Sequence, residues 1–182
     1  AQVNDTLAAY EWLLAQGYQA RHIASLGDSA GGALATAVCL AARDKGLPQP
    51  AASMPISPWY DLEAKGASTK TNADKDCLAS EALTLAMAAT FLGGASPHDP
   101  LASPLHADLR GLAPTYIQVG GDECLLDDAT QFERLARAAG VDIKCEVWPE
   151  MQHCFQIMAG RAPEANDAIA RYVAWVRPKL GL

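Results

Sequence analysis

The chain has 182 residues, of which half are hydrophobic, and a formal net charge of −7 at pH 7. This length suffices for one domain with a substantial core and is too short for two ordinary domains. An acidic chain without a basic run repels a phosphate-rich partner, so we expect no binding to nucleic acid.

The cysteines, the histidines and the hydropathy predict the redox compartment, the metal content and the relation to the membrane. The five cysteines show no C-x-x-C spacing, and their odd number prevents complete internal pairing, so we expect free thiols and a cytoplasmic location. The four histidines have none of the spacings of a zinc site, so we expect no metal ion and no other cofactor. No stretch approaches the ~20 apolar residues of a membrane span.

In chain order, the first expected element is an amphipathic helix at 3–14, where apolar residues recur at three- and four-residue steps. A short apolar run at 22–26 then leads through glycines into an alanine-rich helix at 33–43. This order is strand, tight turn, helix. Further buried strands are expected at 51–56 and 115–119, and each is closed by turn residues.

The last third of the chain repeats the alternation. It predicts a helix at 129–139, a strand at 141–148 and a final helix at 163–177, which ends before Pro178. Strands that alternate with helices indicate the α/β class, with a mostly parallel sheet flanked by helices on both faces.

The long segment 61–113 departs from this alternation. It is polar at its start, helical near 80–92 and rich in turn residues afterwards. We expect one domain over residues 1–182, in which 61–113 is an excursion that helps to shape a substrate pocket. A solvated connection without that role is the alternative.

Residues 27–31 form the pentapeptide Gly-Asp-Ser-Ala-Gly, a G-x-S-x-G pattern with a strand before it and a helix after it. A turn of this kind presents a nucleophile, here Ser29. We expect glycine to be required at Gly27 and Gly31 because a Cβ would collide with adjoining backbone. The Ala30 amide is expected to point at a developing oxyanion. The alternative is a glycine-rich turn with an idle serine.

A serine nucleophile needs a base and an acid, which in this fold follow in the order acid, then histidine. His153 is the best candidate base, because it lies in a loop between the fourth strand and the last helix. The other three histidines precede the nucleophile strand or the expected acid. The acid is expected directly after the third strand, where Asp122 and Glu123 are neighbours, and bottom-up reasoning does not choose between them.

Four separated motifs together resemble the bacterial hormone-sensitive-lipase-like esterases of the α/β-hydrolase fold. The motifs are GDSAGG at 27–32, SPWYDL at 57–62, DPLASP at 99–104 and EMQHCF at 150–155. The resemblance runs from about residue 3 to about residue 177. It implies hydrolysis of short- to medium-chain acyl esters, which are small-molecule substrates, through an acyl-enzyme.

The family pattern also helps to choose the acid, and it shows one position, 154, at which this chain differs from the family. The family's acid opens a D/E-x-L-x-D pattern that Glu123 fits and Asp122 breaks, so the resemblance implies Glu123 beside Ser29 and His153, with Asp122 as the alternative. The family often has glycine or another small residue where this chain has Cys154. We expect this cysteine to alter the packing beside the base.

A larger difference from the family is a motif that this chain lacks. The family's His-Gly-Gly-Gly motif, whose amides supply most of the oxyanion hole, does not occur in this chain, and neither do the N-terminal strands and the cap segment. We therefore expect the C-terminal part of a longer enzyme, poorly active or unstable alone, whose partner is the missing N-terminal part. The strand at 142–148 is expected near the sheet edge, where family members often pair, so a homodimer is a further option.

Two other functions stay open at this stage. One is a non-catalytic ligand-binding protein on the same fold, as the plant gibberellin receptors are, although these receptors have lost the histidine that this chain retains. The other is an amidase or peptidase that uses the same triad, which requires better protonation of an amine leaving group.

Overall fold

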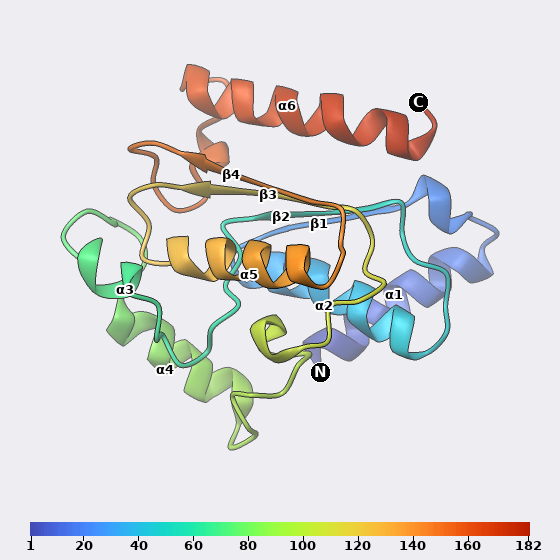
Figure 1. Ribbon diagram of the computed structural model, residues 1–182, viewed down its shortest axis with the longest axis horizontal. Helices are drawn as coiled ribbons and strands as arrows, with labels where there is room; N and C mark the ends of the chain where they lie inside the picture. Colours follow the sequence, from blue (N-terminus) through green and yellow to red (C-terminus); the bar gives the residue numbers. More distant parts are fainter.

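Four parallel strands form the centre of the computed structural model, which describes residues 1–182 (Figure 1). The strands lie side by side in chain order: β1 (Ala24–Asp28), β2 (Ala52–Ile56), β3 (Thr115–Gly120) and β4 (Ile143–Trp148). In the register, Asp28 at the end of β1 pairs with Ile56, and Gly120 pairs with Trp148. The carboxyl ends of all four strands therefore meet at one edge of the sheet.

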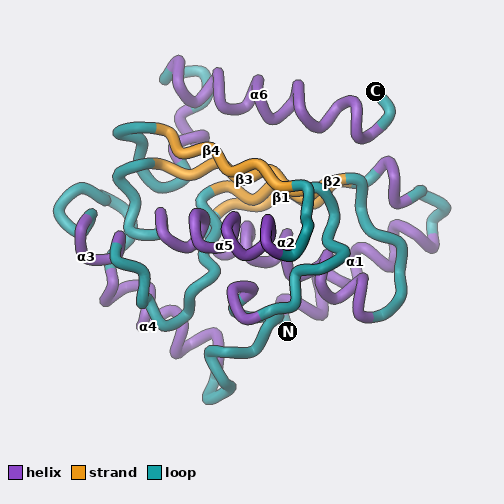
Figure 2. Tube along the Cα trace, viewed as in Figure 1, coloured by secondary structure: helices purple, strands orange, loops and turns teal.

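Helices cover both faces of this sheet. On one face lie α2 (Ala30–Asp44) and α5 (Leu126–Ala138), with α1 (Gln2–Ala15) packed against α2, whereas α6 (Pro163–Leu180) crosses the opposite face (Figures 1 and 2). Because side chains alternate along a strand, β3 packs Ile117 and Val119 with Phe132 of α5 and turns Tyr116 toward Tyr172 of α6. Every residue of β3 is buried, including the polar Thr115 and Gln118, as expected for a strand that helices cover on both faces.

The excursion contains α3 (Ser68–Thr71) and α4 (Glu81–Leu92), which lie near the end where the strands finish (Figure 1). The Ser80 side chain caps α4 by accepting from the Leu83 amide, and Gly93 ends the helix in the left-handed conformation. Three 3₁₀ segments complete the fold: η1 (Ala20–His22), η2 (Pro104–His106) and η3 (Phe155–Met158).

The expected α/β class is confirmed, and each expected helix and strand forms with shifted ends. The first strand starts later than expected because residues 20–22 form η1, and α2 starts earlier because the glycines at 31 and 32 belong to its first turn. The expected end of the last helix before Pro178 was wrong: α6 continues to Leu180 and ends at Gly181 in the left-handed conformation. No helix has both the length and the apolar content that a bilayer crossing requires.

Candidate active site

Ser29 occupies the sharp turn between β1 and α2. Its φ of 53° and ψ of −120° are rarely adopted by a residue with a side chain, so the turn holds local strain. A Cβ on Gly27 would lie 2.2 Å from the Gly31 carbonyl oxygen, so this turn requires glycine at 27. The same expectation for Gly31 was wrong, because its Cβ would point into open space. The second constrained glycine is Gly32, where a Cβ would lie 3.0 Å from Pro58.

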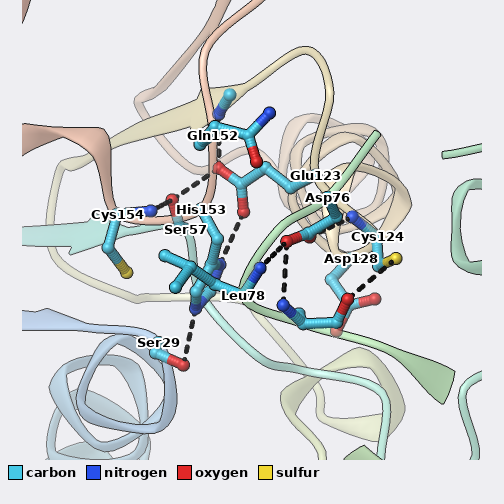
Figure 3. A network of polar contacts seen from close by, with 12 residues as sticks. Ser29, Ser57, Asp76, Leu78, Glu123, Cys124, Asp128, Gln152, His153 and Cys154 are labelled. Carbon is cyan, nitrogen blue, oxygen red and sulfur yellow. Dashed lines mark hydrogen bonds and ion pairs between the residues drawn. The ribbon is translucent and has the colours of Figure 1, made fainter. Parts of the chain in front are cut away.

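His153 reaches Ser29 from the loop that follows β4. Its Nε2 lies 2.9 Å from Ser29 Oγ (Figure 3). This loop crosses the end of β3 so closely that a Cβ on Gly120 would lie 2.2 Å from the Met151 carbonyl oxygen. The Asp122 amide donates to the same carbonyl oxygen at 3.1 Å. The absence of a side chain at Gly120 therefore allows the loop to carry His153 to the end of β1.

Glu123 is the carboxylate that faces the imidazole. Its Oε2 lies 2.8 Å from His153 Nδ1, and the side chain is completely buried. Its Oε1 accepts hydrogen bonds from the Ser57 hydroxyl at 2.6 Å and from the Gly120 amide. A neutral His153 in this arrangement donates from Nδ1 to Glu123 and accepts at Nε2 from Ser29, which is the tautomer that a general base needs.

The adjacent Asp122 points away from the ring, and its Oδ1 lies 3.1 Å from Lys75 Nζ at the surface. Asn72 holds the backbone on either side of Asp122, because its side-chain amide donates to the carbonyl oxygens of Gly121 and Glu123. Sequence reasoning missed this role of Asn72, because contacts across about fifty residues leave no local pattern. The excursion thus helps to position the Glu123 loop.

Ser57 is the second residue that sequence reasoning did not place in this network. Besides donating to Glu123, its hydroxyl accepts from the Cys154 amide at 3.1 Å, so it links the acid to the loop of His153. Ser57 is fully buried and has a φ of 43°. Its position in the SPWYDL motif was the available signal.

The pKa of His153 is set by opposing influences. Burial, the largest, lowers it, whereas contact with Cys154 and the hydrogen bond to Glu123 raise it, and the net result is a pKa above the ordinary value. The surroundings of His153 therefore stabilise the imidazolium that forms when it accepts a proton.

An apolar cavity adjoins the turn that carries Ser29. Nine of its ten lining residues are hydrophobic, and they come from α1, α2, the motif after β2 and the excursion. The lining residues are Gln2, Ala30, Ala33, Leu34, Trp59, Leu62, Met87, Phe91, Leu101 and Ala102.

A family model described as the alpha/beta hydrolase fold matches residues 1–157 of the chain. The chain belongs to this family. Among curated relatives, this chain is 44% identical to an acetyl-hydrolase of Streptomyces hygroscopicus over 181 residues, which is 100% of the chain and 60% of the relative. It is 36% identical to an esterase of Acinetobacter venetianus over 162 residues, which is 88% of the chain and 54% of the relative.

Solved structures of bacterial esterases are also similar to this chain. An esterase from the bacterial hormone-sensitive lipase family superposes with a TM-score of 0.96 at 50% identity, covering 98% of this chain and 60% of that one. The resemblance inferred from four motifs is therefore confirmed. The chain spans about 60% of the length of these relatives.

Proposed function

We propose that this chain carries the catalytic residues of a carboxylic-ester hydrolase that acts on short- to medium-chain acyl esters. The observation that carries the proposal is the continuous hydrogen-bonded series from Ser29 Oγ through His153 to Glu123, with distances of 2.9 and 2.8 Å. The names of the relatives, acetyl-hydrolase and esterase, support the same reaction class.

In the proposed reaction, Ser29 Oγ attacks the acyl carbon while His153 Nε2 takes the hydroxyl proton. Glu123 holds the imidazole and stabilises its positive charge. His153 then protonates the leaving alcohol, and the acyl group stays on Ser29. Water, deprotonated by the same histidine, attacks this acyl-enzyme, which releases the acid and restores Ser29.

The oxyanion that forms during attack needs hydrogen-bond donors. Ala30 is the first residue of α2, and amides in the first turn of a helix have no intrahelical acceptor. The partial positive charge at the helix N-terminus also favours an anion there. These features support Ala30 N–H as one donor of the oxyanion hole.

The remaining donors belong, in our proposal, to an N-terminal part that pairs with β1. The support is the open edge of the sheet at β1, where the apolar side chain of Leu26 is 61% exposed. Beside it lies a largely apolar groove that includes Met54, Ile169 and Val173. The chain's coverage of 60% of its relatives agrees with this proposal.

The apolar cavity beside Ala30 is the proposed site for the acyl chain, with its wall supplied by the excursion through Met87 and Phe91.

We also propose a cytoplasmic location, supported by five free cysteines, which persist in reducing compartments. A homodimer through the open edge of β4 stays a prediction, which sedimentation equilibrium tests.

The experiment compares the full-length protein with its Ser29→Ala variant on p-nitrophenyl butyrate, together with labelling by a fluorophosphonate. We expect hydrolysis and labelling of Ser29 in the parent, and a loss of turnover of at least about 10⁴-fold in the variant. A parent that hydrolyses no ester and takes no label, yet binds an ester ligand, would favour the non-catalytic alternative. Faster hydrolysis of a matched amide than of the ester would favour an amidase.

A further inference from the structure

Outside the proposed active site, three side chains with metal-binding chemistry converge at the surface of the excursion. Glu63, His98 and His106 each offer one ligand atom, and these atoms all lie within 4.8 Å of one another. His98 Nε2 lies 2.8 Å from Glu63 Oε2, and the rings of His98 and His106 have centroids 4.5 Å apart. We propose that these three residues, called here the excursion cluster, bind a zinc ion.

The chemistry of the cluster suits zinc. Two imidazoles and one carboxylate are ligands that zinc commonly takes, and a water molecule completes four-coordination at such three-ligand sites. Ligand atoms about 2.0–2.2 Å from a tetrahedral zinc lie roughly 3.3–3.5 Å apart. The Glu63–His98 pair, at 2.8 Å, must therefore open slightly, and the ligand atoms of His106, within 4.8 Å of the other two, must settle at the same spacing. Both histidines are exposed, so rotation of their side chains can supply this movement.

The backbone that presents Glu63 is already fixed. The carboxylate of Asp61 accepts hydrogen bonds from the amides of Glu63 and Lys65, at 2.8 and 2.6 Å, and so closes a tight turn. Leu62, within this turn, is buried. The Glu63 backbone therefore does not need to move when an ion binds, which limits the entropy lost on binding.

The two histidines are also held by their backbone. The His98 amide donates to Ser96 Oγ at 3.1 Å, and His106 is the last residue of η2, which begins at the buried Pro104. Between the histidines, the Ser103 amide donates to the Asp99 carbonyl oxygen at 2.7 Å. The segment 96–106 is therefore a folded loop that presents both imidazoles beside Glu63.

Lys65 is the natural competitor of the ion. Its Nζ lies 2.7 Å from the same Oε2 of Glu63, and its side chain is 67% exposed. An ammonium group in this position occupies the carboxylate and repels a dication. Because an exposed ion pair contributes little free energy, zinc can displace Lys65 at a modest cost in affinity.

Zinc in the excursion cluster would join the start of the excursion to its later loop. Leu62 adjoins Glu63, while Leu101 and Ala102 lie between the two histidines, and all three line the apolar cavity. The ion would therefore hold together two segments of the cavity wall. Zinc binding by the excursion cluster does not depend on ester hydrolysis at Ser29.

The test uses full-length protein without a histidine tag, in a Cys77→Ser background that removes the exposed thiol. Zinc is titrated by calorimetry and cobalt by its visible absorption, both at a slightly alkaline pH. We expect one bound ion, with affinity at least about tenfold weaker in His98→Ala and in His106→Ala. Lys65→Ala should tighten binding by up to about fivefold.

His22→Ala is the matched control, because His22 is an exposed histidine next to the end of α6. Zinc affinity should be unchanged in this variant, and zinc should slow hydrogen exchange in residues 96–106 of the parent. The proposal is overturned if the parent binds no zinc at micromolar concentration. It is equally overturned if the double variant His98→Ala/His106→Ala binds as tightly as the parent.

Discussion

The molecule contains two histidine–carboxylate pairs with the same separation and very different surroundings. His153 and Glu123 lie 2.8 Å apart, as do His98 and Glu63. The Glu123 side chain is completely buried and is also bonded to the Ser57 hydroxyl, whereas Glu63 is partly exposed and shared with Lys65. Distance alone therefore does not define a site. Burial and the Ser57 hydroxyl hold the His153–Glu123 pair in one geometry, whereas exposure leaves the His98–Glu63 pair free to adjust.

The largest effect is expected from removing the buried carboxylate. In Glu123→Ala, His153 loses the partner that fixes its tautomer and stabilises its charge, so turnover of p-nitrophenyl butyrate should fall by about 10³- to 10⁴-fold. The matched control is Asp122→Asn, because this neighbouring carboxylate points to Lys75. A larger loss in the control than in Glu123→Ala would assign the acid to Asp122.

A smaller loss of turnover is expected when Glu123 is retained but its hydrogen bond from Ser57 is removed. Ser57→Ala removes a donor to Glu123 and an acceptor for the Cys154 amide, so we expect turnover to fall about tenfold, in line with ~1–2 kcal/mol for a buried hydrogen bond. With less of its charge neutralised, Glu123 should attract the His153 proton more strongly. The acid limb of the pH–rate profile should then move to higher pH, and an unmoved limb would mean that Ser57 has a purely structural role.

A third carboxylate tests what burial does without a histidine. Asp128 is buried and accepts from the amides of Tyr60 and Asp61, and burial raises its pKa to about 8. The folded state thus binds the Asp128 proton more tightly than the unfolded state, in which the pKa is near 3.8. Its contribution to stability is complete below pH 3.8 and is lost as the pH rises toward 8.

The measurement is urea unfolding of Asp128→Asn and the parent across this pH window. Asparagine keeps an oxygen acceptor for both amides and carries no charge. We expect the parent to lose at least about 1.4 kcal/mol relative to the variant as the pH rises, which corresponds to one unit of pKa. Parallel pH dependences in the two proteins would contradict the raised pKa of Asp128.

The smallest effect is expected at Cys154, beside the buried pair. In the proposed reaction His153 acts as a base and must be neutral, so the rate should rise with pH through a pKa above the ordinary 6.5. Contact with Cys154 contributes to the raised value, so Cys154→Gly should move the acid limb to lower pH. Because residue 154 has a φ of 54°, glycine fits its backbone without strain. A limb that moves to higher pH would contradict this role of the cysteine.

Much of the architecture was predictable because it depends on local patterns. The apolar run before Gly27, the small residues after it and the later strand–helix alternation indicated the parallel sheet and the turn that carries Ser29. In this fold the serine, the acid and the histidine each follow a successive part of the sheet, which predicts that they occur in this order along the chain. Element ends were less predictable, as Pro178 shows, because the last turn of a helix depends on the residues beyond it and on the contacts of its end.

The amino-acid sequence by itself determined the alternation of strands and helices, the turn at Ser29 and the region of the acid. Only the tertiary structure decided that Glu123, and not Asp122, faces the imidazole, because adjacent side chains in a loop point in different directions. It also brought Glu63 beside His98, 35 residues later in the chain. Such contacts depend on the path of the excursion around the sheet, and no periodicity in the sequence records that path.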